Sequence, residues 1–163
     1  MPLAAANMEA RKPDETLFSV TPRLQPYFKL HGSSNFVGDG GRILIMGGNK
    51  AAGIRGNPLL NWYHDQIIDH LARATKLMVI GYSFGDYEAL TAAAERETLE
   101  LFIVDPQGVD VLQREKREVG VKVVDPLIEK LGPRVTGASR RGLASIFGGD
   151  LVEIGKLMRF LSS

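Results

Sequence analysis

The segment Gly81-Tyr-Ser-Phe-Gly85 follows a continuous apolar run, and its residue types could serve a phosphate-bearing ligand. Glycine lets the backbone turn tightly and lets a ligand approach without colliding with a Cβ atom. A helix is expected directly after this turn, and its first N–H groups and positive dipole end would favour phosphate. Asp105 ends the next apolar run, about 24 residues after Gly81, and an acid at that distance accepts hydrogen bonds from a ribose in dinucleotide folds. The alternative is a plain tight turn, with Asp105-Pro106 as a turn that ends a strand.

The same five residues match the G-x-S-x-G pattern, in which a strained turn exposes a nucleophilic serine. That pattern belongs to hydrolases whose catalytic histidine comes later in the chain than the serine. The three histidines here, His31, His64 and His70, all precede Ser83. The order of residues therefore disfavours a serine hydrolase.

His31 follows a predicted strand and precedes Gly32, a position from which an imidazole can project into a cleft at the carboxyl end of a sheet. The alternative is a loop histidine that hydrogen-bonds to the backbone. Lys50 and Arg55 lie in a glycine-rich segment and could contact phosphate. We favour the interpretation of these two as solvated loop charges.

Short apolar runs alternate with helical patterns along the chain, which predicts right-handed βαβ units and an α/β fold. We expect the strands to lie in one largely parallel sheet with flanking helices. The predicted strands are Tyr27–Leu30, Arg42–Met46, Leu77–Ile80, Leu99–Val104 and Val121–Val124.

Helices are predicted over residues 58–74, from about residue 86 to 98, and from about residue 109 to 118. Pro58 fits the first turn of a helix, where its missing N–H costs nothing, and Asp86 is placed to cap the second helix. A last helix begins at Asp150, where Glu153 completes a capping-box pattern. Its predicted apolar stripe consists of Leu151, Ile154, Met158 and Leu161.

The composition limits the cellular compartments and the kinds of partner that we expect for this chain. The formal net charge is +1, so no global field attracts the chain to nucleic acid or to a membrane surface. There is no cysteine, which removes disulfides and thiolate-bound zinc. No apolar run approaches the ~20 residues needed to cross a bilayer, and no secretion signal is visible. We expect a cytoplasmic protein with neither a nucleic-acid nor a membrane partner.

Three segments together resemble the SIR2-like (sirtuin-type) NAD-binding family, in its bacterial zinc-free branch. They are Lys29-Leu-His-Gly-Ser-Ser-Asn-Phe36, Gly81-Tyr-Ser-Phe-Gly-Asp86 and Ile103-Val-Asp-Pro106. Their order and spacing match the family over about residues 28–106. The resemblance implies a Rossmann-like domain over residues 17–163, the C-terminal portion of the family domain, after a poorly ordered segment at residues 1–16.

The resemblance also implies a cofactor, NAD, and a set of site residues. His31 would be the catalytic general base, taking a proton from the nicotinamide ribose, a role that suits a near-neutral imidazole. The cofactor-binding residues would be Gly32, Gly81, Ser83, Phe84 and Asp105. The turn of Gly81, Ser83 and Phe84 would lie beside the ribose and phosphate part, and Asp105 would lie near the adenosine end. No metal site is implied.

The chain departs from the family pattern in ways that leave several functions open. The zinc module of the deacylases needs four cysteines, so protein deacylation is disfavoured. The Gly-Ala-Gly-x-Ser phosphate loop and the Thr-x-Asn-x-Asp segment are both missing, so the domain is incomplete on its N-terminal side. Leu90 replaces a polar residue of the family turn. The alternatives are an NAD glycohydrolase of a bacterial defence type, completed by another subunit or an upstream-encoded half-domain, and an inactive module that binds NAD or ADP-ribose or serves only as an interaction domain.

Overall fold

A computed structural model describes residues 8–9, 21, 23, 27–38, 41–47, 50–82, 87–113, 116–118, 121–123 and 125–163. The chain forms two compact units, residues 1–67 and residues 68–163. The prediction of one family domain over residues 17–163 stays a prediction. No described helix combines the length and the apolar character needed to cross a membrane.

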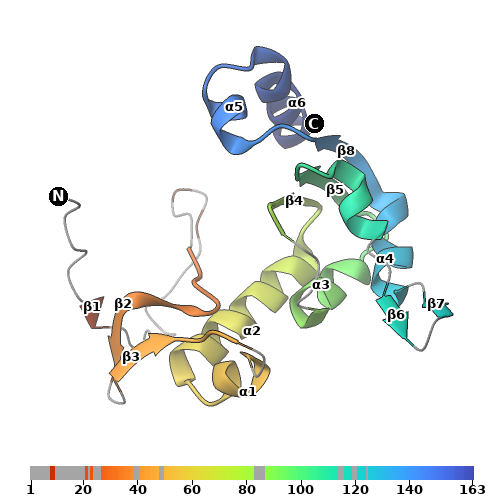
Figure 1. The fold of residues 1–163 in the computed structure, drawn as a ribbon. Helices are drawn as coiled ribbons and strands as arrows, with labels where there is room; N and C mark the ends of the chain where they lie inside the picture. Colours follow the sequence, from red (N-terminus) through yellow and green to blue (C-terminus); the bar gives the residue numbers. More distant parts are fainter. Residues whose placement is uncertain are drawn as a thin grey trace. The chain divides into compact units, whose positions relative to one another are not determined.

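Unit 1 is built around a three-stranded sheet with the order β1-β2-β3 (Figure 1). Its strands are β1 (Met8–Glu9), β2 (Gly32–Gly38) and β3 (Gly41–Leu44). β2 and β3 form an antiparallel hairpin, and β1 pairs with β2 in parallel. The helices α1 (Lys50–Arg55) and α2 (Pro58–Arg73) follow, with Phe36, Ile43, Leu59 and Leu60 as a buried cluster.

The sequence misplaced the first strand of this unit. Residues 27–29 have no regular structure, and Gly32 N donates to Lys29 O at 2.9 Å to close a turn. The strand predicted at Tyr27–Leu30 is therefore wrong, and β2 begins where a break was expected. The strand predicted at Arg42–Met46 exists as β3, but it belongs to the antiparallel hairpin. The predicted loop with Lys50 and Arg55 contains α1.

Helix α2 confirms the expectation for residues 58–74. Asn57 Oδ1 accepts hydrogen bonds from the N–H groups of Leu59 and Leu60 at 3.1 Å each, so Asn57 caps the helix. Pro58 occupies the first turn, as predicted. Leu60 and Leu71, which lie on this helix, are buried.

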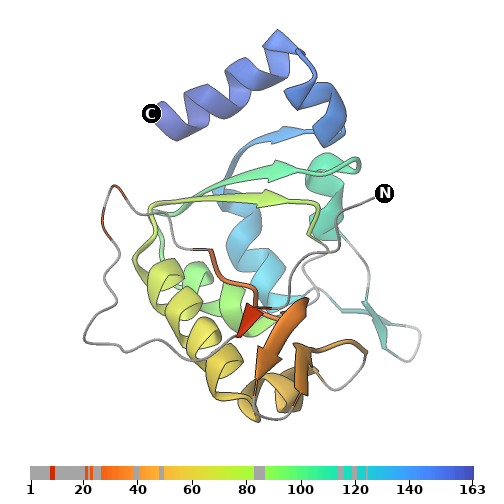
Figure 2. The same ribbon diagram turned by 90° about the vertical axis from the view of Figure 1, so that its left-hand side faces the viewer.

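Unit 2 contains a parallel sheet with the order β4-β5-β8 (Figure 2). Its strands are β4 (Lys76–Ile80), β5 (Glu100–Val104) and β8 (Val135–Ser139). The first two confirm the strands predicted at Leu77–Ile80 and Leu99–Val104. β8 was not predicted, and it pairs with β5 in parallel.

Helices flank both faces of this sheet (Figure 1 and Figure 2). α5 (Leu143–Phe147) and α6 (Leu151–Ser162) cover one face, where Phe102 and Val104 pack against Ile146, Leu157 and Phe160. α3 (Tyr87–Ala94) and α4 (Pro126–Leu131) lie on the opposite side. Side chains alternate between the faces of a strand, so the fully buried Leu101 and Ile103 point toward that second face.

The region between β5 and α4 differs from the prediction. The helix expected at residues 109–118 is a 3-10 helix, η1 (Gly108–Gln113), followed by a short strand, β6 (Lys116–Glu118). β6 pairs antiparallel with β7 (Val121–Val123), outside the main sheet. A second 3-10 helix, η2 (Gly132–Arg134), leads into β8. The described strands therefore form three sheets, and the prediction of a single parallel sheet is wrong.

Helix α6 confirms its predicted start and corrects its predicted orientation. Asp150 accepts a hydrogen bond from Glu153 N at 3.2 Å, so it caps the helix as expected. The buried positions are Glu153, Leu157 and Phe160. The stripe predicted to be buried is mostly outside: Leu151, Met158 and Leu161 are 80%, 55% and 60% exposed. The fold is thus mixed α/β, with a three-stranded parallel sheet and flanking helices.

Candidate functional site at the carboxyl edge of the parallel sheet

The carboxyl ends of β4, β5 and β8 meet at one edge of the sheet in unit 2. Gly81 follows β4 and donates its N–H to Val104 O at 2.9 Å, and Asp105 follows β5 and donates its N–H to Ser139 O at 3.0 Å. These two bonds tie together the loops where ligands collect in open α/β sheets. The structure therefore brings Gly81 and Asp105 to the same edge, as the sequence predicted.

Gly81 has a φ of +59°, a left-handed conformation that glycine adopts easily. Among the described residues, none beyond the two chain neighbours of Gly81 places an atom within 4 Å of the position that a Cβ would occupy there. Ser83 and Phe84, the other cofactor-binding residues predicted in this turn, lie outside the described residues, as does Asp86.

Asp105 uses one carboxylate oxygen to shape its own loop. Oδ1 accepts a hydrogen bond from Gln107 N at 2.8 Å, and the carbonyl oxygen accepts one from Gly108 N at 2.7 Å. This is the Asx-type turn that aspartate favours at the end of an element. The strand-ending turn offered as the alternative for Asp105 is therefore present. It remains compatible with a ligand contact, because a carboxylate can accept several hydrogen bonds.

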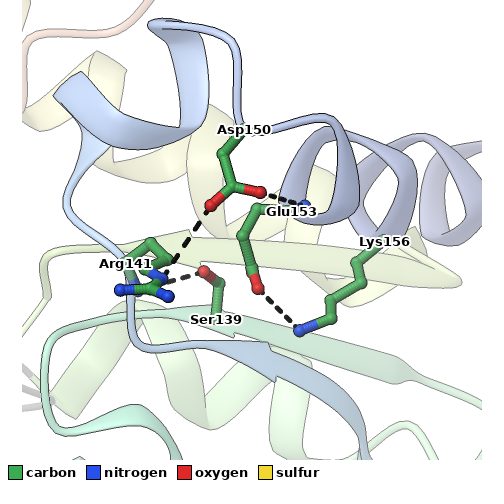
Figure 3. Close-up of polar contacts among 5 residues, drawn as sticks. All are labelled: Ser139, Arg141, Asp150, Glu153 and Lys156. Carbon is green, nitrogen blue, oxygen red and sulfur yellow. Dashed lines mark hydrogen bonds and ion pairs between the residues drawn. The ribbon is translucent and has the colours of Figure 1, made fainter.

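The end of β8 is joined to the start of α6 by a polar network (Figure 3). Ser139, the last residue of β8, is buried, and its Oγ accepts a hydrogen bond from Arg141 N at 3.2 Å. Arg141 Nε lies 3.9 Å from Asp150 Oδ2, so the arginine also contacts the residue that caps α6. The network fixes the loop between β8 and α6 at the same edge as Asp105.

Glu153 is the buried carboxylate of this network, with 8% of its surface exposed. Its Oε1 accepts a hydrogen bond from Lys156 Nζ at 2.7 Å. Lys156 first, and then the Ser139 hydroxyl, hold the pKa of Glu153 below its ordinary range. Although Ser139 acts on this charge, no hydrogen bond of ordinary geometry from a described residue reaches Oε2. Glu153 is therefore an ionised and buried hydrogen-bond acceptor at the carboxyl edge of the sheet.

A hollow of about 380 Å³ opens beside this network. Its lining is Val109, Ala138, Arg140, Arg141, Glu153 and Lys156. Each of its three cations has a carboxylate nearby: Arg140 pairs with Asp110 at 2.7 Å, Arg141 with Asp150 and Lys156 with Glu153. The hollow is thus polar but close to charge-neutral, which suits a ligand group that is polar rather than strongly anionic.

The polar residues between the end of β8 and the start of α6 were not predicted as site residues. No role was predicted for Arg140 and Arg141, which the structure places in ion pairs with Asp110 and Asp150. Asp150 and Glu153 were identified only as a capping box. The available signal was a pair of arginines followed nine residues later by the acid that caps a helix. This signal indicates a site only when the arginines are known to follow β8, which was not predicted.

In unit 1, the segment around His31 forms a compact local structure. Lys29 Nζ donates to Ser33 Oγ at 3.0 Å, and Ser33 Oγ donates to Asn35 Oδ1 at 2.6 Å. Lys29 Nζ also lies 4.9 Å from the centre of the Phe36 ring. The polar residues of the predicted family motif are therefore bonded to one another along the start of β2.

His31 and Gly32 sit at the turn that enters β2. His31 is half-buried, and its carbonyl oxygen accepts a hydrogen bond from Ile45 N at 2.9 Å. Gly32 has a φ of +77°, and a Cβ there would lie 2.0 Å from Ile43 O. Glycine is thus required at this position by the hairpin itself, whatever its relation to a cofactor.

His31 belongs to unit 1, whereas Gly81 and Asp105 belong to unit 2. The expectation that His31 and the turn after β4 face one cleft stays a prediction. Among the described residues there is no group of three or more histidines, cysteines, aspartates or glutamates that could hold a metal ion.

Comparison of the chain with models of protein families, with curated proteins and with solved structures finds no match in any of the three.

Proposed function

We propose that this chain is a SIR2-like module that binds the ADP-ribose part of NAD at the carboxyl edge of β4, β5 and β8. The observation that carries the proposal is the joint position of Gly81 and Asp105, which follow neighbouring parallel strands at one edge. Ligands of open α/β sheets bind at this edge. The order of the three family-like segments in the sequence is the second support.

The described residues fit the adenosine half of NAD. Asp105 offers Oδ2 to a ribose hydroxyl while Oδ1 holds the turn. The neighbouring hollow of about 380 Å³ is within the size range of ligand pockets and is polar without excess charge. The left-handed turn at Gly81 has no Cβ atom, which suits a close approach of phosphate to the backbone. When bound, NAD would supply the reactive bond between nicotinamide and ribose.

The proposal takes two forms that differ in chemistry. In the first, the module belongs to an NAD glycohydrolase, in which His31 accepts a proton from the nicotinamide ribose and nicotinamide is released. In the second, the module binds NAD or ADP-ribose without turning it over. The sequence has no Gly-Ala-Gly-x-Ser loop to orient the pyrophosphate, so the first form needs that loop from another subunit or half-domain. Deacylation is disfavoured because the chain has no cysteine for a zinc module.

Binding is tested by calorimetric titration of ADP-ribose into the chain and its Asp105→Asn variant. Asparagine keeps the Asx turn but loses the carboxylate charge, so we expect the affinity to fall about tenfold with little change in stability. Asp69→Asn is the matched control, because Asp69 is an exposed carboxylate that pairs with Arg73 on α2. Failure to bind ADP-ribose, or equal affinity in Asp105→Asn, would contradict the proposal.

Catalysis is tested separately by nicotinamide release from NAD, with the chain beside its His31→Ala variant. A general base typically supplies about 10²–10⁴-fold of rate, and orientation of the substrate supplies much of the rest. We therefore expect little or no turnover by this chain alone. Fusion to a SIR2-like N-terminal half should restore turnover, and His31→Ala should then abolish it while NAD still binds. Robust turnover by the chain alone that is lost in His31→Ala would show that the phosphate loop is dispensable. Restored turnover that survives His31→Ala would remove this histidine from the reaction.

A further inference from the structure

Arg140 lies against the turn that Asp105 closes. Gly108 N donates to Asp105 O within that turn, and Asp105 N donates to Ser139 O, the residue just before Arg140. A Cβ placed on Gly108 would lie 2.9 Å from both Cγ and Nε of Arg140. The Arg140 side chain is therefore packed on the turn that Asp105 closes, on the same edge as the carboxylate proposed to contact the ribose.

The charge of Arg140 is already engaged. Its Nη2 donates to Asp110 Oδ2 at 2.7 Å, and the two side chains are 64% and 52% exposed. Asp110 is fixed by η1, which begins at Gly108, so the ion pair spans the same turn. The other two cations of the hollow, Arg141 and Lys156, also have carboxylate partners. None of the three is left without an acid.

The two common dinucleotides differ by one phosphate on the adenosine ribose. An acid beside the ribose accepts a hydrogen bond from a free 2′-hydroxyl and repels a 2′-phosphate, whereas a nearby arginine accommodates the phosphate. This edge contains both kinds of group, Asp105 and Arg140. Which dinucleotide it prefers then depends on whether the arginine is available.

We infer that Asp110 makes the site selective for nucleotides with a free 2′-hydroxyl over those with a 2′-phosphate, by holding Arg140 in an ion pair. Asp110 is a positioning residue, because it acts through Arg140 and does not touch the ligand. The inference rests on the proposed binding of ADP-ribose at this edge. It adds the class of dinucleotide, NAD rather than NADP, and the residue that decides it.

The test compares ADP-ribose with 2′-phospho-ADP-ribose as calorimetric probes. Wild-type protein should bind ADP-ribose about tenfold more tightly, and Asp110→Asn should tighten the binding of 2′-phospho-ADP-ribose about tenfold by releasing the guanidinium group. Adding Arg140→Gln to Asp110→Asn should cancel that gain. The matched control is Glu95→Gln, which breaks another exposed ion pair, with Lys130 at 2.6 Å, and should leave the ratio of the two affinities unchanged.

The outcomes separate the inference from the proposed function. Equal binding of the two probes by wild-type protein, or no gain in Asp110→Asn, would overturn the inference while binding of ADP-ribose stands. A gain that survives Arg140→Gln would also overturn it, since the effect would not pass through the arginine. Failure of wild-type protein to bind ADP-ribose would overturn the proposed function and the inference with it.

Discussion

The segment around His31 in unit 1 and the sheet edge in unit 2 use polar residues in opposite ways. In unit 1, Lys29, Ser33 and Asn35 bond to one another within seven residues of sequence, from 29 to 35. In unit 2, Asp105 follows β5 and Ser139 ends β8. These two residues are 34 positions apart in the sequence and meet only because β5 and β8 pair in parallel. The first arrangement is a local motif, and the second is assembled by tertiary structure.

The two regions also differ in what a glycine of the family-like segments can indicate. A glycine at the entry to β2 is explained by the hairpin alone, because a Cβ at Gly32 would meet Ile43 O. At the glycine after β4, no described residue beyond its chain neighbours lies within 4 Å of a Cβ position, and the described structure requires glycine there only for its left-handed turn. Substitutions at these two positions should therefore separate a structural glycine from one that a ligand can use.

The largest effect is expected for Gly32→Ala. The added Cβ would lie 2.0 Å from a backbone oxygen at a positive φ, so we expect a loss of about 3 kcal/mol or more in the free energy of unfolding of unit 1. Gly81→Ala should cost only about 1–2 kcal/mol, the price of the left-handed conformation. Denaturation followed by fluorescence of Trp62, the single tryptophan and buried in unit 1, measures the first effect. Equal losses in the two variants would contradict the distinction.

A smaller effect is expected for Gly137→Ala in β8. Its Cβ would lie 2.6 Å from the Phe102 ring, which is buried against α6, and overpacking of this kind costs about 1–3 kcal/mol. Gly142→Ala is the control, because nothing lies within 4 Å of the corresponding position. Far-UV circular dichroism in denaturant should show the loss in Gly137→Ala alone. An unchanged transition would mean that β8 does not pack on Phe102.

The smallest effect is expected for Glu153→Gln, since glutamine keeps the shape and a carbonyl acceptor. The pKa of Glu153 is lowered, chiefly by Lys156, from an ordinary value of 4.5. The ionised carboxylate therefore stabilises the fold above pH 4.5, and that contribution is lost as the pH falls through the lowered pKa. Wild-type protein should be more stable than Glu153→Gln at neutral pH, and the difference should shrink on acidification. Thermal unfolding of both proteins across this range measures it, and a difference independent of pH would contradict the assigned charge.

The strands and helices that the sequence predicted well are those with strong apolar patterns. β4 and β5 contain continuous apolar runs, from Leu77 to Ile80 and from Leu101 to Val104, and α2 repeats apolar residues at helical spacing. β8 reads Val135-Thr-Gly-Ala-Ser139, with a single large apolar residue. The reason is that the Phe102 ring fills the space above Gly137. When a neighbouring strand supplies the large side chain, the strand itself shows little apolar pattern in its sequence.

The features that were predicted wrongly or missed depend on contacts between residues that are far apart in the sequence. The charge of buried Glu153 is balanced by Lys156 and stabilised further by the Ser139 hydroxyl, and α6 turns the face with Glu153 inward and leaves Leu151 outside. Gly81 and Asp105 lie at one edge because the parallel strands β4 and β5 end there, and their role in binding a cofactor stays a prediction. Arg140 and Asp110 escaped notice, since their pairing depends on β8 and η1 lying side by side.

The most direct test of the central claim is a titration of ¹⁵N-labelled chain with ADP-ribose, followed through backbone amide resonances. The account predicts saturable shifts for Gly81, Asp105 and Gln107 at the carboxyl edge, with the amides of Lys76 and Glu100 at the opposite ends of β4 and β5 as the internal reference. Saturable shifts confined to the carboxyl edge would support the assigned site. The absence of saturable shifts there, or shifts centred on the opposite ends of the same strands, would contradict it.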